Sequence, residues 1–243
     1  MSINFSLVLP CYNEEKNIAF ICSEFLELPL EKLEAELILV NNGSRDATKT
    51  EIEKAIKNNN SKNVIIKLVD LKSNQGYGGG ISEGLKEATG DYIGWAHADL
   101  QTPLIDFYKL FKMIKNKKNI LGKGYRVNNR GFDGIVSRLH ENLASIVLGA
   151  KMKEINAQPK IFNKELMKYF NRMPRKWTTL DTYIFYVCLK NNVEIKTIDV
   201  VFNTRKFGES KWKNNFFNFI SHIIFNIFYL FKLRLTKVKN DTR

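Results

Sequence analysis

One short segment of the sequence, Trp95 to Gln101, combines residue types that can bind a metal ion. Asp99 directly follows an apolar run, and Gln101 lies two residues further along the chain. In an extended loop, residues two apart point the same way, so both side-chain oxygens would face one cation. Mg²⁺ prefers oxygen ligands and is usually held by one or two carboxylates together with substrate phosphates. The alternative is that Asp99 caps a helix that begins near Pro103.

A second segment, Arg205 to Lys211, has the composition of a phosphate clamp. The cations of Arg205 and Lys211 enclose a flexible glycine, Gly208, and the hydroxyl of Ser210. Guanidinium, ammonium and hydroxyl groups all donate hydrogen bonds to phosphate oxygens. A solvated basic loop is the alternative interpretation.

A glycine-rich segment, Asn74 to Gly80, opens a predicted helix, so a dinucleotide-binding loop has to be considered. The Gly-x-Gly-x-x-Gly pattern fails in both registers, because its third position would be Ile81 or Glu83. The glycines are better explained by a close approach of the backbone to a ligand or to the sheet, with a structural turn as the alternative.

The elements that must position these segments alternate between strands and helices. Apolar runs predict strands at 5–10, 36–40, 64–69, 92–96 and 193–202, and helical periodicity predicts helices at 14–28, 46–57, about 79–88, 135–148 and 179–190. Ser44 and Asp46 both suit the N-cap of the second helix. Repeated strand–helix units predict an α/β fold with a mainly parallel sheet and helices on both faces. Ligands of such sheets bind beyond the carboxyl ends of the strands, which directs attention to loops 10–14, 41–46 and 97–103.

Composition sets the class of protein. A chain of 243 residues with 44% apolar residues suits one folded domain. The formal charge of +13 favours anionic partners, but no basic cluster interleaves with aromatics, so nucleic acid is not predicted. Three cysteines without a Cys-x-x-Cys pair indicate a reducing compartment, and no secretory signal stands at the N-terminus, so we expect a cytoplasmic protein.

Four motifs occur in order at the predicted strand ends: Leu9 to Glu15, Leu39 to Asp46, Asn74 to Gly80, and Ala98 to Pro103. Together they resemble the motifs of family 2 glycosyltransferases with the GT-A fold, especially the polyprenyl-phosphate mannose (glucose) synthase-like branch. The resemblance covers roughly residues 3 to 211. The segment from Arg205 to Lys211 is similar to the family's Arg-x-x-Gly-x-Ser-Lys element.

The resemblance implies a site for a UDP- or GDP-linked sugar and a divalent metal, Mg²⁺ or Mn²⁺. Asp99 would be the metal-binding acid of the family's Asp-x-Asp motif, with Gln101 as an additional ligand. The residues implied to contact the donor are Pro10, Tyr12, Glu14, Asn42, Gly76, His97, Ala98, Arg205 and Lys211.

Two positions depart from the family pattern. Asn41 and Asn42 stand where the family often has aspartates, although an amide can still hydrogen-bond a base or a ribose hydroxyl. His97 replaces the first aspartate of Asp-x-Asp, and imidazole suits Mn²⁺ or softer metals better than Mg²⁺. His97 would alternatively hydrogen-bond the diphosphate or lie outside the metal's ligands.

The acceptor site is expected in the second half of the chain. Transfer with inversion needs a base for a hydroxyl acceptor, and none for a phosphate that is already an anion. The resemblance suggests Asp181 or Glu154 as that base, and Gln158, Lys160 and Ser210 as acceptor-binding residues. Asp181 also suits the first turn of its helix.

The C-terminal stretch, residues 213–243, is predicted to be a separate element from the catalytic domain at 1–212. Its uncharged run from Phe216 to Phe231 would reach roughly 24 Å as a helix, at ~1.5 Å per residue, and a bilayer span needs ~20 residues. Polar residues recur every fourth position, at Asn214, Asn218, His222 and Asn226. The pattern favours a helix lying in one leaflet with basic flanks on the headgroups. A contact within or between copies of the chain and a true span are the alternatives.

These observations predict a metal-dependent, inverting glycosyltransferase that acts on polyprenyl phosphate at the cytoplasmic face of the membrane. Two alternatives stay open: a glycosyltransferase with a soluble or envelope-polysaccharide acceptor, and a catalytically degenerate protein that only binds nucleotide sugars. A nucleotidyltransferase is disfavoured, because the chain lacks a glycine-rich N-terminal loop followed by a basic pair.

Overall fold

A computed structural model describes residues 3–128, 131–176, 179–205 and 216–236. Seven strands form one sheet in the order β3-β2-β1-β4-β6-β5-β7. The strands are β1 (Phe5–Cys11), β2 (Ala35–Asn42), β3 (Val64–Leu71), β4 (Tyr92–Trp95), β5 (Ile120–Arg126), β6 (Lys160–Asn163) and β7 (Glu194–Val200). All neighbours pair in parallel except β6, which runs antiparallel to both β4 and β5. The predicted α/β class is confirmed.

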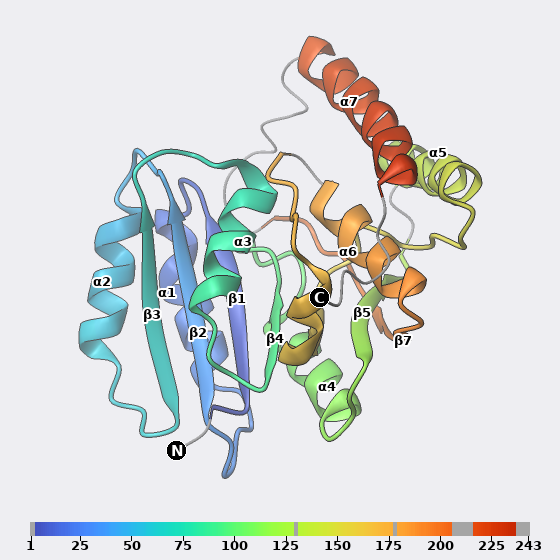
Figure 1. Cartoon of the computed structure of the whole chain (residues 1–243). Coiled ribbons are helices and arrows are strands. Elements are labelled where there is room, and N and C mark those ends of the chain that lie inside the picture. Colours follow the sequence, from blue (N-terminus) through green and yellow to red (C-terminus); the bar gives the residue numbers. More distant parts are fainter. Residues whose placement is uncertain (1–2, 129–130, 177–178, 206–215, 237–243) are drawn as a thin grey trace.

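Helices cover both faces of this sheet (Figure 1). They are α1 (Glu15–Leu26), α2 (Thr48–Asn58), α3 (Gly76–Glu87), α4 (Leu104–Ile114), α5 (Gly131–Leu148), α6 (Thr179–Lys190) and α7 (Phe216–Leu235), with a 3₁₀ helix, η1 (Lys164–Tyr169). Residues of α1, α2 and α4 belong to one hydrophobic cluster, and residues of α3, α5, α6 and α7 belong to the other. The sheet is therefore the middle layer of three.

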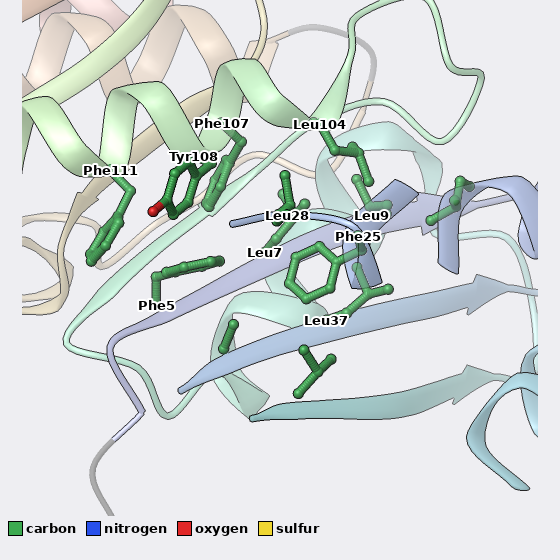
Figure 2. Close-up of a cluster of buried hydrophobic side chains, with 14 of the residues drawn as sticks. Phe5, Leu7, Leu9, Phe25, Leu28, Leu37, Leu104, Phe107, Tyr108 and Phe111 are labelled. Carbon is green, nitrogen blue, oxygen red and sulfur yellow. The ribbon is translucent and has the colours of Figure 1, made fainter. Parts of the chain in front are cut away.

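The central strands are buried on both faces, as strands of a parallel sheet usually are. On β1, Phe5 and its alternate neighbours point to the α1 and α4 side, while Val8 points to the α3 side. The ring of Phe5 lies 4.8 Å from that of Phe111 and 6.1 Å from that of Phe25 (Figure 2). This cluster fixes α1 and α4 against the strand that leads into the first predicted loop.

Two strands, β5 and β6, are absent from the sequence prediction. β5 contains two glycines and Lys123, which do not resemble a strand, and β6 is only four residues long. The glycines have a packing reason: a Cβ at Gly124 would lie 2.3 Å from the carbonyl oxygen of Gln158. Such long-range contacts leave no local signal in the sequence.

The start of α2 differs from the prediction. Its N-cap residue is Ala47 rather than Ser44 or Asp46. Asp46 Oδ1 nevertheless accepts the backbone N–H of Thr48 at 3.0 Å, so it satisfies one donor of the first turn. Ser44 instead accepts the backbone N–H of Asn13 at 3.0 Å and joins two loops.

Helix α7 packs against α5 and α6 with a mixed inward face. His222 and Asn226, two members of the predicted polar stripe, are buried, as are Leu230 and Leu233 in its second half. Asn214 lies outside the described residues. Ile224 and Phe228 are 61% and 69% exposed, so the outward face carries large apolar side chains. Within the described part of the chain, no helix combines the length and apolar character needed to cross a bilayer.

Glu36 on β2 connects the first four strands through a buried carboxylate. Its oxygens accept hydrogen bonds from Ser6 on β1 at 2.5 Å and from the backbone and hydroxyl of Thr89, just before β4, at 3.0 Å each. It also forms an ion pair with Lys67 on β3. Burial by itself would raise the pKa of Glu36, but these hydrogen bonds outweigh burial and lower the pKa.

Replacing Glu36 by Gln should lower the free energy of unfolding at pH 7 by about 2–4 kcal/mol, because buried donors lose a charged acceptor. A carboxyl whose pKa is lowered by folding stabilises the fold above its unfolded pKa of about 4.3, and this stabilisation is lost as the pH falls. The difference from wild type should therefore shrink between pH 7 and about pH 3 in urea unfolding followed by circular dichroism.

The matched control is Glu53→Gln, which removes an exposed partner of Lys49. It should change stability by less than about 0.5 kcal/mol. Equal stability of the two variants at pH 7 would contradict the role given to Glu36.

Candidate active site

The first two predicted loops are joined at the carboxyl edge of the sheet. Asn13, with a φ of 57°, accepts the backbone N–H of Arg45 through its side-chain oxygen at 2.9 Å. The backbone N–H of Glu15 donates to Asp46 at 3.2 Å, and that of Glu14 donates to Thr48 at 2.8 Å. The polar residues that the sequence places after β1 and β2 therefore hold each other in position.

A cleft of about 520 Å³ opens above these loops. Its lining includes five of the residues predicted to contact the donor: Pro10, Tyr12, Glu14, Asn42 and Gly76. It also includes Asn74, Tyr77 and Lys176, which were not predicted as binding residues. Asn74 and Tyr77 belong to the glycine-rich segment identified in the sequence, whereas Lys176 belongs to no motif that would have predicted its place in the cleft. The cleft brings together residues from three loops.

Asn42 ties the end of β2 to the glycine-rich segment. Its side-chain oxygen accepts the backbone N–H of Gln75 at 2.9 Å, and its amide donates to the carbonyl of Gly76 at 3.0 Å. An aspartate could make the first contact but could not donate the second. The asparagine at this position therefore has a structural use in holding the wall of the cleft.

The glycines of this segment allow close approach of another chain segment. A Cβ at Gly76, which has a φ of 77°, would lie 2.8 Å from the carbonyl oxygen of Arg175, and one at Gly78 would lie 2.4 Å from that of Pro174. A Cβ at Gly80 would lie 3.1 Å from Cβ of Pro10 on β1 and 3.0 Å from the amide nitrogen of Asn42 on β2. The predicted close packing against the sheet is therefore confirmed at Gly80, whereas the approach of residues 174–175 was not predicted.

Asp99 and Gln101 converge, but not through the extended loop that was predicted. Leu100 between them has a φ of 57°, and the backbone N–H of Gln101 donates to Asp99 Oδ1 at 3.2 Å. Asp99 does not cap the following helix: the backbone N–H of Leu104 donates instead to Glu24 at 2.6 Å. The alternative role for Asp99 is therefore wrong.

Arg205 bridges the two converging side chains. Its Nη2 lies 3.2 Å from Asp99 Oδ2, and its Nε donates to Gln101 Oε1 at 3.3 Å. The amide of Gln101 donates to the carbonyl of Asn203 at 2.8 Å, and the N–H of Asn203 donates to the carbonyl of Gln101 at 2.8 Å. The segment after β7 is thereby fixed to the turn after β4.

The donor atoms at this position suit a hard divalent cation. A carboxylate oxygen and an amide oxygen face one positive charge, which leaves further positions for phosphate oxygens. No group of three or more His, Cys, Asp or Glu side chains is placed to hold a metal within the described residues. Asp99 and Gln101 would therefore supply only part of the ligands of a metal ion, and a diphosphate would have to supply others.

His97 stands between two aromatic rings. Its ring meets that of Tyr77 at 5.6 Å and that of Phe202 at 6.3 Å, both edge to face. Its Nε2 lies 3.4 Å from the hydroxyl of Tyr77, and its Nδ1 lies 4.0 Å from Asp99. Burial lowers the pKa of His97 despite the nearby carboxylates, which favours a neutral ring at pH 7.

Tyr77 links His97 to a buried ion pair. Gln158 donates one hydrogen bond to the Tyr77 hydroxyl at 2.8 Å and another to Asp181 Oδ1 at 2.9 Å. Lys160 Nζ reaches the same oxygen of Asp181 at 2.5 Å and also donates to the carbonyl of Ala157. Lys160 and Asp181 are almost completely buried. Three residues predicted at the acceptor side thus form one network behind the cleft.

A second charged cluster lies at the end of β5. Arg126 Nε donates to Glu154 at 2.5 Å, and its Nη2 lies 4.0 Å from Glu141. Nη2 has no hydrogen-bond partner among the described residues although it is buried. Nearby Lys123 is buried on β5, and burial lowers its pKa to about 7. Glu154 was a predicted base, while Arg126, Glu141 and Lys123 were missed.

Three predicted residues do not present a side chain to the cleft in the described structure. The side chain of Ala98 belongs to the core cluster on the α1 side, so any contact with a donor would come from its backbone. Ser210 and Lys211 lie outside the described residues.

The cleft and the charged turn after β4 both lie at the carboxyl edge of the sheet, where ligands of open α/β folds bind. A sequence model of the family described as Glycosyl transferase family 2 matches residues 6–189. The chain belongs to this family.

Individual relatives agree with this assignment. The chain is 30% identical over 178 residues to a poly-beta-1,6-N-acetyl-D-glucosamine synthase of Staphylococcus epidermidis. The matched region covers 67% of this chain and 40% of that protein. The chain thus spans less than half the length of this curated relative.

Solved structures show the same GT-A fold. Glucosyl-3-phosphoglycerate synthase from Mycobacterium tuberculosis, solved with Mn²⁺ and UDP, has a TM-score of 0.65 at 18% identity over 93% of this chain and 80% of that one. A mannosyltransferase from Pyrobaculum calidifontis, solved with GDP-mannose and Mn²⁺, also has a TM-score of 0.65, at 16% identity over 97% and 71% of the two chains.

Replacing Lys160 by Met should lower the free energy of unfolding by about 3–5 kcal/mol, because Asp181 is left charged and unpaired in the interior. The double variant Lys160→Met, Asp181→Leu should recover most of that loss, since no buried charge remains. Urea unfolding of the wild type and the two variants measures both effects. A double variant no more stable than Lys160→Met would contradict the ion-pair interpretation.

Proposed function

We propose that the chain transfers a sugar from a UDP- or GDP-linked donor to a polyprenyl phosphate, with inversion and with a divalent metal. The observation that carries the proposal is the meeting of the cleft around Pro10, Asn42 and Gly76 with the charged turn of Asp99, Gln101 and Arg205 at one sheet edge. A nucleoside in the cleft would direct its diphosphate toward that turn. Solved proteins of the same fold that hold UDP or GDP-mannose with Mn²⁺ support this donor class.

Each side chain of the turn has a defined task in the proposal. Asp99 and Gln101 would hold the metal, which when bound would supply positive charge to the departing diphosphate. Arg205 and Lys211 bind phosphate oxygens. His97, which is neutral, contributes a hydrogen bond near the diphosphate rather than a second carboxylate.

A phosphate acceptor fits the surroundings of Asp181. An anionic phosphate attacks without a base, whereas a hydroxyl would need one. Asp181 is 1% exposed, and its Oδ1 already accepts hydrogen bonds from Lys160 and Gln158. These contacts favour a role for Asp181 in positioning Gln158 and Lys160. Arg126 Nη2, which has no hydrogen-bond partner among the described residues, would donate to an acceptor phosphate on this side.

The exposed faces of α5 and α7 suit a lipid-linked acceptor. Apolar side chains recur at helical spacing along both helices, which pack on each other (Figure 1). The exposed ones are Ile135, Leu139, Ile146, Ile220, Ile224, Ile227, Phe228, Phe231 and Leu235. Lys232 is exposed at the end of α7, where it would meet anionic headgroups. We propose that this surface rests on the cytoplasmic leaflet.

A polysaccharide acceptor is the second candidate function. It is favoured by the 30% identity to a poly-beta-1,6-N-acetyl-D-glucosamine synthase. In that case a hydroxyl is glycosylated, and a base must become available at Asp181 or Glu154.

A donor screen tests the function. UDP- and GDP-sugars are offered with Mn²⁺ or Mg²⁺ and either polyprenyl phosphate or oligosaccharide acceptors, and release of the nucleoside diphosphate is measured. Release that requires polyprenyl phosphate is the expected result. If release of the nucleoside diphosphate requires the oligosaccharide, the acceptor is a polysaccharide rather than polyprenyl phosphate. Donor binding without turnover would indicate a catalytically degenerate binding protein.

Replacing Asp99 by Asn should reduce metal-dependent transfer by at least about 10³-fold, because the metal loses its one carboxylate ligand and the diphosphate loses its counter-charge. Asp91→Asn, at the opposite end of β4 and exposed, should retain the wild-type rate. Retained activity of the Asp99 variant would refute this assignment.

Replacing Ile224 and Phe228 together by Ser should weaken binding to anionic liposomes by at least about tenfold, since each apolar side chain contributes ~1.5–3 kcal/mol when it leaves water. Co-sedimentation at several vesicle concentrations gives the partition coefficient. Ile65→Ser, which changes an exposed apolar residue on edge strand β3, is the control and should bind like wild type. Equal binding by all three proteins would argue against this surface.

A further inference from the structure

Arg205 occupies the position that the proposed function gives to a metal ion. The guanidinium contacts Asp99 Oδ2 at 3.2 Å and Gln101 Oε1 at 3.3 Å, and these are the same two side chains that would hold the metal. Asp99 Oδ2 and Gln101 Oε1 cannot both contact the guanidinium of Arg205 and bind a metal ion tightly at the same time. The two cations therefore compete for one place.

Neighbouring hydrogen bonds orient Asp99 and Gln101 so that one oxygen of each faces the guanidinium of Arg205. Gln101 is oriented by the hydrogen bond from its amide to Asn203, so its oxygen faces Arg205. Asp99 is 7% exposed as a side chain and is held by the N–H of Gln101 through its other oxygen. A carboxylate with so little access to water is costly to leave without a positive partner. Arg205 is that partner when no metal is bound.

A divalent ion that enters alone meets an unfavourable charge balance. Asp99 brings one negative charge, while Arg205 and the metal would bring three positive charges into one small region. His97, whose Nδ1 lies 4.0 Å from Asp99 Oδ2, has an imidazole side chain and therefore adds no negative charge to this region. A nucleoside diphosphate changes this balance, because its phosphates supply negative charge for the metal and a new partner for the displaced guanidinium.

We propose that Arg205 is the resident counter-cation of Asp99, so that the metal binds only together with a diphosphate that draws the guanidinium away. The proposal rests on the proposed function in that it takes the ligand to be a nucleoside diphosphate. It deepens that function by making metal and donor binding interdependent. The positive charge of Arg205 and its bridging contact with Asp99 and Gln101 together enforce this order.

Binding of Mn²⁺ without nucleotide tests the proposal, with the loss of the free Mn²⁺ signal in electron paramagnetic resonance as the readout. Arg205→Gln should bind Mn²⁺ at least about tenfold more tightly than wild type, because the competing cation is gone. Arg205→Lys should lie between them, since an ammonium cannot span both oxygens. Arg175→Gln is the control, because it removes an exposed arginine that pairs with Glu83 outside the turn, and it should match wild type.

Two further measurements keep the result specific. Adding Asp99→Asn to Arg205→Gln should abolish the gained Mn²⁺ affinity. Adding UDP or GDP to wild type should raise its Mn²⁺ affinity by at least about tenfold, and should raise that of Arg205→Gln by less. Circular dichroism establishes that each variant is folded.

Each contrary outcome has a defined meaning. The proposal is overturned if wild type and Arg205→Gln bind Mn²⁺ alike without nucleotide, or if the double variant keeps the gain. A failure of the proposed function appears differently: the Arg205→Gln gain without nucleotide persists, while neither UDP nor GDP binds to wild type in calorimetry.

Discussion

Two opposite charges, Lys160 on β6 and Asp181 on α6, are buried together behind the cleft. Neither can be left alone there without a large cost, so the strand and the helix must stay in contact. Asp181 also accepts a hydrogen bond from Gln158, which in turn reaches Tyr77 in the wall of the cleft. The position of the cleft relative to Gln158 and Lys160 thus depends on this one pair.

The same network holds His97 in place. The ring and the hydroxyl of Tyr77 contact His97 at the position where the family resemblance implies an aspartate. A second carboxylate beside Asp99 would need a further positive partner in this partly buried place. With a neutral ring there, one guanidinium from Arg205 balances the remaining charge. In the turn after β4, the negative charge of Asp99 is therefore paired with the positive charge of Arg205.

Much of the fold follows from local patterns. The alternation of buried strands and amphipathic helices predicts β1 to β4 and their helices, and α6 is predicted with its observed bounds. The prediction fails at β5 and β6, because Gly124 and the buried Lys123 and Lys160 are accommodated by partners far away in the sequence. It also leaves open which side of α7 faces the protein, since only packing on α5 and α6 decides that His222 and Asn226 point inward.

By itself, the sequence determines which strand ends carry polar residues, and hence that Pro10, Asn42 and Asp99 meet at one edge of a parallel sheet. That follows from periodicity and from the handedness of strand–helix units, which are properties of short segments. Only the tertiary structure decides that Arg205 meets Gln101 from 104 positions away, and that Lys160 and Asp181 share a buried site. Those pairings require the antiparallel insertion of β6 between β4 and β5, an arrangement that no short segment of the chain encodes.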